Sequence, residues 1–183
     1  MSAVIPRHRV NVLTGIKSAR LIEDPVEYAN LINKAKRPLL VVGPLLLAST
    51  ADGKILMDHA LDIAKSCNIP IRATAQTKGK VVELGVKPDS VYDVVEIVNA
   101  LKDPDWQGVK KEGNHDLVIF FGIRSDLGNQ CLSTLKHFAP PLKTMTLCKH
   151  YFPHANYSLP NFKKDAKWLE FLEGLIANLK KGN

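Results

Sequence analysis

The sequence has few cysteines and no long apolar run. Its three cysteines form no CxxC pair and lie far apart, at Cys67, Cys131 and Cys148. An odd, widely spaced set indicates reduced thiols, and it falls short of the four cysteines that an iron–sulfur cluster usually takes. No apolar stretch reaches the roughly 18 residues of a membrane span, and none follows the basic segment 7–9 as in a secretory signal. We therefore expect a soluble, cytoplasmic protein with no membrane partner.

Several motifs of catalysis and nucleotide binding are also missing. GxGxxG, GxxxxGK[ST], GxSxG and HExxH do not occur. Cys148, His150 and His154 form a C-x-H-x-x-x-H cluster, but a zinc site needs a fourth ligand, to which nothing in the sequence points. We interpret this segment as a structural loop. The sequence gives no case for independent catalysis, so we predict neither catalytic residues nor metal ligands.

The charge is basic. The 25 Lys and Arg outnumber the 18 Asp and Glu, which gives a net charge of +7. Such a balance is typical of proteins with a nucleic acid or another acidic partner. The positive residues are scattered, however, and several lie at predicted helix ends, where they complement the helix dipole. We therefore expect no nucleic-acid partner.

The first clear structural signal is a helix followed by a strand. Asp24-Pro25-Val26-Glu27 predicts a helix start, with Asp at the N-cap, Pro at the first helical position and Glu in the capping-box position. The continuous apolar run 39–42 predicts a buried parallel strand that ends at Gly43-Pro44.

The same alternation continues along the chain. Further strands are predicted at 69–73, 117–121 and 142–147, with weaker candidates at 10–13 and 81–84. Helices are predicted over 56–67, after a cap at Asp89 or Ser90, after a cap at Ser125 or Asp126, and over 168–179. Strands that alternate with helices indicate right-handed βαβ crossovers. The predicted fold class is α/β, a doubly wound, Rossmann-like parallel sheet, with an N-terminal arm over 1–23 and a single α/β domain over 24–183.

Ligands of such sheets bind at the carboxyl ends of the strands, where the strand order reverses. The candidate cofactor-binding residues therefore follow the predicted strands: Gly43, Thr74, Lys78, Gly79, Gly122, Arg124 and Ser125. A glycine after a strand lets backbone N–H groups approach a diphosphate, and Lys or Arg supplies charge. The alternative interpretation of Gly43 and Gly122 is that they form tight turns. Pro44 removes one backbone donor from this place.

Three segments resemble one superfamily. Arg37–Gly43, Ile69–Thr74 with Lys78-Gly79, and Asp116–Arg124 are similar to strands and loops of the central domain of thiamine-diphosphate enzymes. That superfamily, the DHS-like NAD/FAD-binding domains, includes deoxyhypusine synthase and the sirtuins. The resemblance implies a domain that binds the ADP part of FAD or NAD, or an empty scaffold.

Over essentially its whole length the chain resembles the epsilon subunits of archaeal acetyl-CoA decarbonylase/synthase. This resemblance implies a non-catalytic subunit that pairs with the alpha subunit, two of each, as the carbon monoxide dehydrogenase component. It further implies a stabilising role, or passage of electrons toward FAD, the candidate cofactor. We expect the partner to meet the arm 4–21 and Trp106, although Trp106 could instead pack on its own domain. The alternative is a stand-alone NAD- or FAD-binding enzyme.

Overall fold

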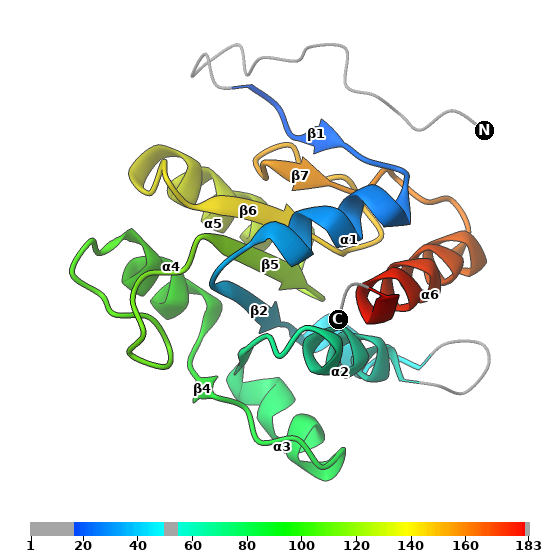
Figure 1. Ribbon diagram of the computed structural model, residues 1–183, viewed down its shortest axis with the longest axis horizontal. Helices are drawn as coiled ribbons and strands as arrows, with labels where there is room; N and C mark the ends of the chain where they lie inside the picture. The colour runs from blue at the N-terminus through cyan, green and yellow to red at the C-terminus, as the bar shows by residue number, and fades with distance from the viewer. Residues whose placement is uncertain (1–16, 50–54, 182–183) are drawn as a thin grey trace.

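The computed structural model describes residues 17–49 and 55–181. Its centre is a seven-stranded parallel sheet in the order β1-β7-β6-β5-β2-β3-β4 (Figure 1). The strands are β1 (Arg20–Leu21), β2 (Pro38–Val42), β3 (Ile71–Ala73), β4 (Ser90–Val91), β5 (Leu117–Phe121), β6 (Lys143–Thr146) and β7 (Tyr157–Ser158). The helices are α1 (Pro25–Lys34), η1 (Pro44–Leu47, a 3₁₀ helix), α2 (Leu56–Ser66), α3 (Ala75–Glu83), α4 (Val94–Lys102), α5 (Ser125–Phe138) and α6 (Asp165–Lys181).

Helices cover both faces of the sheet, which confirms the predicted doubly wound α/β fold. Alternate side chains of β2 and β5 enter two separate apolar clusters. Leu40 and Ile119 pack in the cluster that holds residues of α1, α2, α3 and α6, whereas Val41 and Phe120 pack with residues of α4 and α5. The continuous apolar runs of these strands are therefore explained by burial on both sides.

The start of α1 follows the sequence pattern in part. The Asp24 carboxylate accepts a hydrogen bond from the backbone N–H of Val26 at 2.9 Å, and Pro25 is the first helical residue. Glu27 pairs with Arg20. The first strand, β1, uses Arg20 and Leu21 from the predicted arm and pairs with β7.

One of the two weak strand predictions is wrong, and so is the loop predicted before it. Residues 81–83 belong to α3, which also contains the predicted loop residues Lys78 and Gly79. Thr77 and Val81, four residues apart, are the buried positions of this helix, so its apolar face has the helical period. The other weak prediction, 10–13, lies outside the described residues.

The predicted caps of two later helices are also misplaced, by three or four residues in α4 and by one or two in α5. Asp93, not Asp89 or Ser90, is the N-cap of α4, and it forms a capping box with Glu96. Ser90 lies in the edge strand β4, a two-residue element that the apolar pattern did not indicate. In α5 the N-cap position belongs to Arg124, and Ser125 begins the helix.

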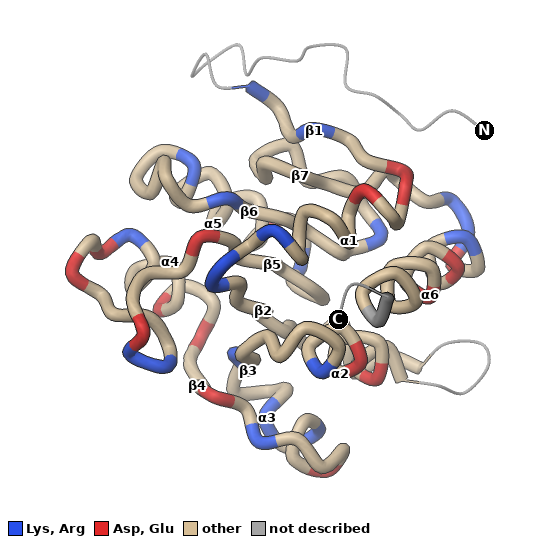
Figure 2. The backbone as a smooth tube through the Cα atoms, in the orientation of Figure 1, with Lys and Arg blue, Asp and Glu red and all other residues tan. Residues whose placement is uncertain are grey.

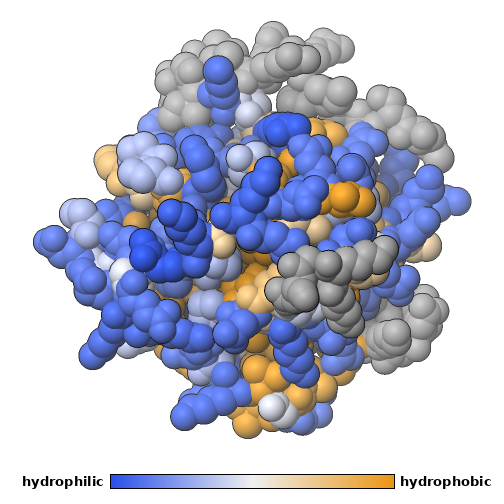
Figure 3. All heavy atoms as spheres, in the orientation of Figure 1, coloured by the Kyte–Doolittle hydropathy of each residue, from blue (hydrophilic) through white to orange (hydrophobic). Residues whose placement is uncertain are grey.

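The surface carries charges of both signs. Lys and Arg are interspersed with Asp and Glu along the described backbone (Figure 2). Figure 3 shows an apolar area over α3, where the side chain of Val82 is 53% exposed. None of the helices in the described part of the chain is long and apolar enough to cross a membrane.

Candidate functional site

The order of strands reverses between β2 and β5, and a cavity of about 520 Å³ lies at their carboxyl ends. The chain runs from β2 to β3 on one side of β2, and it returns later to β5 on the other side. This is where doubly wound sheets bind ligands. Residues that follow β2, β5 and β6 line the cavity, among them Leu45, Leu46, Gly122, Arg124, Ser125 and Lys149.

The backbone around Gly43 makes its hydrogen bonds within the fold. The N–H of Gly43 donates to the carbonyl of Phe121 at 2.8 Å, and the N–H of Leu45 donates to the carbonyl of Gly122 at 3.0 Å. Pro44 has no N–H. The N–H groups with which such a turn would bind a diphosphate are therefore engaged or absent.

Leu46 fills the space beside Gly122. This leucine is fully buried, and a Cβ atom added to Gly122 would lie 2.4 Å from its Cγ. A Cβ added to Gly43 would lie 2.4 Å from the carbonyl oxygen of Gly122. Both glycines are required because the two turns touch each other and because η1 packs on them, which supports the tight-turn interpretation.

The basic side chains at the cavity have acidic partners in the same chain. Arg124 Nη2 lies 2.6 Å from Asp126 Oδ2, and Lys149 Nζ lies 2.6 Å from Asp165 Oδ1. The hydrogen bond from Arg124, and then that from the N–H of Leu127, hold the pKa of Asp126 below its ordinary value. Asp126 thus occupies the start of α5, where a phosphate would otherwise be favoured. The residues present do not fit the diphosphate of FAD or NAD.

Gly43 lies against Gly122 without lining this cavity, and three further candidate residues do not line it either. Thr74 is buried at the start of α3, where its Oγ1 lies 3.1 Å from Thr77 Oγ1. Lys78 and Gly79 are exposed within α3, and a Cβ added to Gly79 would meet nothing within 4 Å. The structure therefore brings together Gly43, Gly122, Arg124 and Ser125, and it places Thr74, Lys78 and Gly79 elsewhere.

Burial disfavours the thiolate form of all three cysteines. Burial raises the pKa of Cys131 and of Cys148 to about 11, and it also raises the pKa of Cys67. The Sγ atom of Cys148 lies 3.9 Å from the carbonyl oxygens of Phe120 and Ile123. Within residues 17–49 and 55–181, no group of three His, Cys, Asp or Glu side chains could hold a metal ion.

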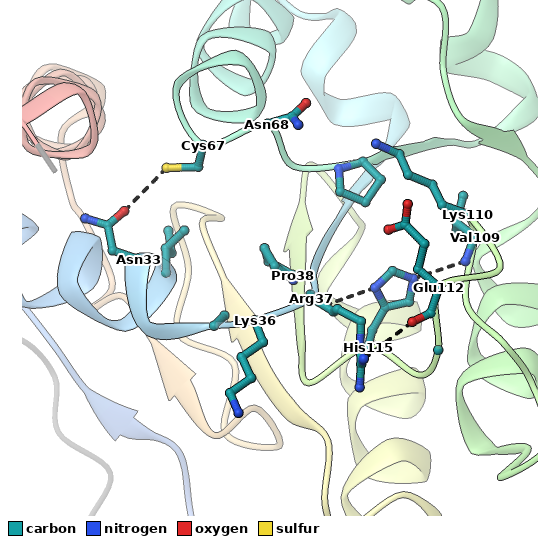
Figure 4. Close-up of a pocket in the computed structure, with 14 residues that line it drawn as sticks. Asn33, Lys36, Arg37, Pro38, Cys67, Asn68, Val109, Lys110, Glu112 and His115 are labelled. Carbon is teal, nitrogen blue, oxygen red and sulfur yellow. Dashed lines mark hydrogen bonds between the residues drawn. The ribbon is translucent and has the colours of Figure 1, made fainter. Parts of the chain in front are cut away.

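A second cavity, of about 410 Å³, lies at the amino ends of β2 and β5 (Figure 4). The Asp116 carboxylate accepts the N–H groups of Lys36 and Arg37 at 2.7 and 2.8 Å. His115 Nε2 accepts the N–H of Val109 at 3.2 Å, so its Nδ1 carries the proton and donates to the Arg37 carbonyl at 3.0 Å.

This second network attaches the loop 109–116 to the start of β2. Arg37 Nε also donates to the carbonyl of Asn114 at 2.6 Å. Cys67 faces Asn33, with its Sγ 3.4 Å from Asn33 Oδ1, and it points away from His115 (Figure 4). The cavity therefore holds no thiol–imidazole pair for nucleophilic catalysis, and its polar groups serve the fold.

Trp106 and Arg72 lie near the β4 edge of the sheet. Trp106 is half-buried, and its ring centroid lies 5.5 Å from that of His115, so it packs on its own domain. Sequence reasoning missed Arg72, which lies buried in β3 and lines a third cavity. The available signal was a charged residue in the middle of a predicted buried strand.

Comparison with known proteins gives consistent matches over nearly the whole chain. A family model described as CO dehydrogenase beta subunit/acetyl-CoA synthase epsilon subunit matches residues 2–176. The acetyl-CoA decarbonylase/synthase complex subunit epsilon of Methanothermobacter thermautotrophicus is 42% identical over 166 residues, 91% of each chain. Subunit epsilon 1 of Archaeoglobus fulgidus is 39% identical over 157 residues, 85% of this chain and 82% of that one. Subunit epsilon 1 of Methanosarcina barkeri is 36% identical over 163 residues, 88% of this chain and 90% of that one.

Proposed function

Because this chain belongs to the CO dehydrogenase beta subunit/acetyl-CoA synthase epsilon subunit family, we propose that it is an accessory subunit of an acetyl-CoA decarbonylase/synthase complex. In this proposal the chain pairs with the alpha subunit, two of each, and contributes no catalytic residue. The alpha subunit supplies the nickel–iron–sulfur chemistry of the carbon monoxide dehydrogenase component. The chain stabilises that subunit by binding to it.

The observation that supports a stabilising role is that Leu46 and the Arg124–Asp126 pair occupy the diphosphate position at the cavity between β2 and β5. Leu46 lies where a diphosphate would approach Gly122, and the nearby Arg124 is paired with Asp126. A chain that carried electrons through FAD would need donors and charge at this place. We therefore favour stabilisation over electron transfer to FAD.

Exposed apolar side chains support a role in assembly. Leu45 and Leu47 of η1 are 50% and 40% exposed, and Leu45 lines the cavity between β2 and β5. Exposed apolar side chains of this kind are typical of a subunit that buries them against a partner. Most of the predicted partner-facing arm, 4–16, lies outside the described residues, so its role stays a prediction.

Size-exclusion chromatography with light scattering tests the pairing. The purified chain and the purified alpha subunit, mixed at equal concentration, should elute together with the mass of two copies of each. The alpha subunit should also lose carbon monoxide oxidation more slowly on heating when the chain is present, because binding to the folded state stabilises it. An unrelated Rossmann-like domain of similar size serves as the control. Separate elution of the two proteins would contradict the proposal.

A further inference from the structure

Arg72 is a buried cation with no acidic partner in the described part of the chain. It is the middle residue of β3 and only 4% exposed. Its neighbours Ile71 and Ala73 pack in the cluster with α1, α2, α3 and α6, so the Arg72 side chain lies on the opposite face of the sheet. Its Nε is buried without a hydrogen-bond partner, and no described carboxylate forms an ion pair with its guanidinium.

A buried guanidinium in this state is unusual. It carries five N–H donors, and removing a charge from water is costly unless the charge is paired. Among the described residues the guanidinium contacts the ring of Tyr92, whose centroid lies 4.3 Å from the guanidinium carbon. A ring face attracts a cation but accepts no strong hydrogen bond. The donors of Arg72 are therefore available to an anion.

The side chain lines a cavity of about 640 Å³ between β4 and the turn 106–111. Tyr92 is 53% exposed at this cavity, and Trp106 and Gln107 also line it. Lys111 adds a second positive charge to the lining. We call this group of residues the Arg72 pocket: Arg72, Tyr92, Trp106, Gln107 and Lys111.

The acidic side chains near Arg72 are committed to other groups. Asp89 lines the same cavity, but its Oδ2 accepts the N–H of Ile71 at 2.8 Å and its Oδ1 lies 3.8 Å from Lys110 Nζ. Glu96 accepts the N–H of Asp93 at 2.9 Å in the capping box of α4. Glu96 lies near enough to attract the Arg72 charge but forms no ion pair with it, so within the described residues no carboxylate accepts a hydrogen bond from the Arg72 guanidinium.

We propose that the Arg72 pocket receives the carboxylate of an aspartate or glutamate side chain from the partner subunit, an inference that rests on the proposed function. A carboxylate accepts two parallel N–H bonds from a guanidinium, which matches the unused donors of Arg72. Arg, Tyr and Trp are the residue types most enriched where interfaces concentrate their affinity, and all three meet here. The pocket also lies beside β4, the strand at one edge of the sheet (Figure 1). The net charge of the chain, +7, likewise favours an acidic partner.

Substitution of Arg72 tests this assignment in the complex with the alpha subunit. Arg72→Met should raise the Kd for the alpha subunit at least about tenfold, because it removes a central charged contact. Arg72→Lys should give a smaller loss, since it keeps the charge but not the two parallel donors. Lys65→Met, on the exposed side of α2, is the matched control and should bind within twofold of the unchanged chain.

The isolated chain supplies a second readout. Arg72→Met should leave the melting temperature unchanged or raise it, because methionine replaces an unpaired buried charge with an apolar side chain. A purely structural arginine would instead give a lower melting temperature.

Hydrogen exchange of the unsubstituted chain gives a third readout that needs no variant. The amides of Tyr92 and of 107–111 should exchange at least tenfold more slowly in the complex than in the isolated chain. Unchanged exchange there, or an Arg72→Met variant that binds within twofold of the unchanged chain, would overturn the pocket assignment alone. Failure of the unchanged chain to bind the alpha subunit would overturn the proposed function as well.

Discussion

Gly43 and Gly122 lie against each other where β2 and β5 end, and they explain why this part of the chain is hard to interpret from sequence. A glycine after a buried strand is equally consistent with a diphosphate site and with a tight turn. The contacts distinguish the two: Gly122 has a φ of +76°, and an added Cβ on either glycine would overlap its surroundings. The sequence could predict that these glycines matter, but the position of Leu46 was needed to show why.

Alanine substitutions should separate a required glycine from an incidental one. Gly122→Ala should lower the free energy of unfolding by about 2–4 kcal/mol, since a left-handed non-glycine residue and an overpacked site are each costly. Gly79→Ala should raise it by about 0.5–1 kcal/mol, because Gly79 lies in α3 with open space around it. Chemical denaturation of both variants is the measurement. Equal effects of the two substitutions would contradict the account.

His115 makes the stability of the chain depend on pH. Burial lowers its pKa below the ordinary value of 6.5, although its hydrogen bond to the Arg37 carbonyl acts in the opposite direction. As the pH falls, the unfolded chain therefore binds a proton at His115 before the folded chain does. The contribution of His115 to the free energy of unfolding is complete above pH 6.5 and is lost below it. The loss should level off once the pH is below the pKa of the folded state.

The variant His115→Gln tests this dependence by removing the titrating group. Between pH 6.5 and pH 5, its free energy of unfolding should fall less steeply than that of the unchanged chain, by at most about 1.4 kcal/mol per pH unit. Burial also lowers the pKa of His154. Since this residue is present in both proteins, its effect cancels in the difference between their free energies of unfolding. Parallel curves for the two proteins would show that His115 does not carry the effect.

At the scale of elements, long apolar runs were predictable and short or polar elements were not. Strands β2 and β5 have five residues each, and all of these residues are apolar. Such a continuous apolar run is typical of a parallel strand that is buried on both faces. Strands β1, β4 and β7 have two residues each, so no period could reveal them. Helix α3 was missed because Gln76 and Lys78 make its first turns polar and Gly79 lowers its helix propensity.

The start of α4 is a local signal, and sequence analysis placed its cap too early in the chain, at Asp89 or Ser90 instead of Asp93. Asp93→Ala should lower the free energy of unfolding by about 1 kcal/mol, because it leaves N–H groups at the start of α4 without an acceptor. Asp93→Asn should change it by less than about 0.5 kcal/mol, since asparagine also caps helices. Thermal or urea unfolding of the two variants measures the difference. If both variants lost the same stability, the negative charge and not the cap would be responsible.

At the scale of the whole molecule, the doubly wound parallel class of the sheet could be predicted, whereas the state of its cleft could not. Alternating strands and helices imply a crossover point, and the structure has one between β2 and β5. Whether that point holds a ligand depends on η1, four residues whose sequence, Pro44–Leu47, gives no sign that Leu46 turns inward. Resemblance predicted the family correctly, and the family matches confirm it. The superfamily's cofactor, by contrast, stays a prediction that the contacts around Gly43 and Gly122 do not favour.

The central claim is that a nucleotide-binding type of fold has become a docking scaffold in which its own residues occupy the diphosphate position. A titration with FAD, followed by flavin fluorescence, tests it most directly. The samples are the isolated chain, the alpha subunit alone and the complex of the two. We predict no fluorescence change for the isolated chain, and the same change, if any, for the complex as for the alpha subunit alone. Saturable quenching that requires this chain, at one FAD per copy, would contradict the account.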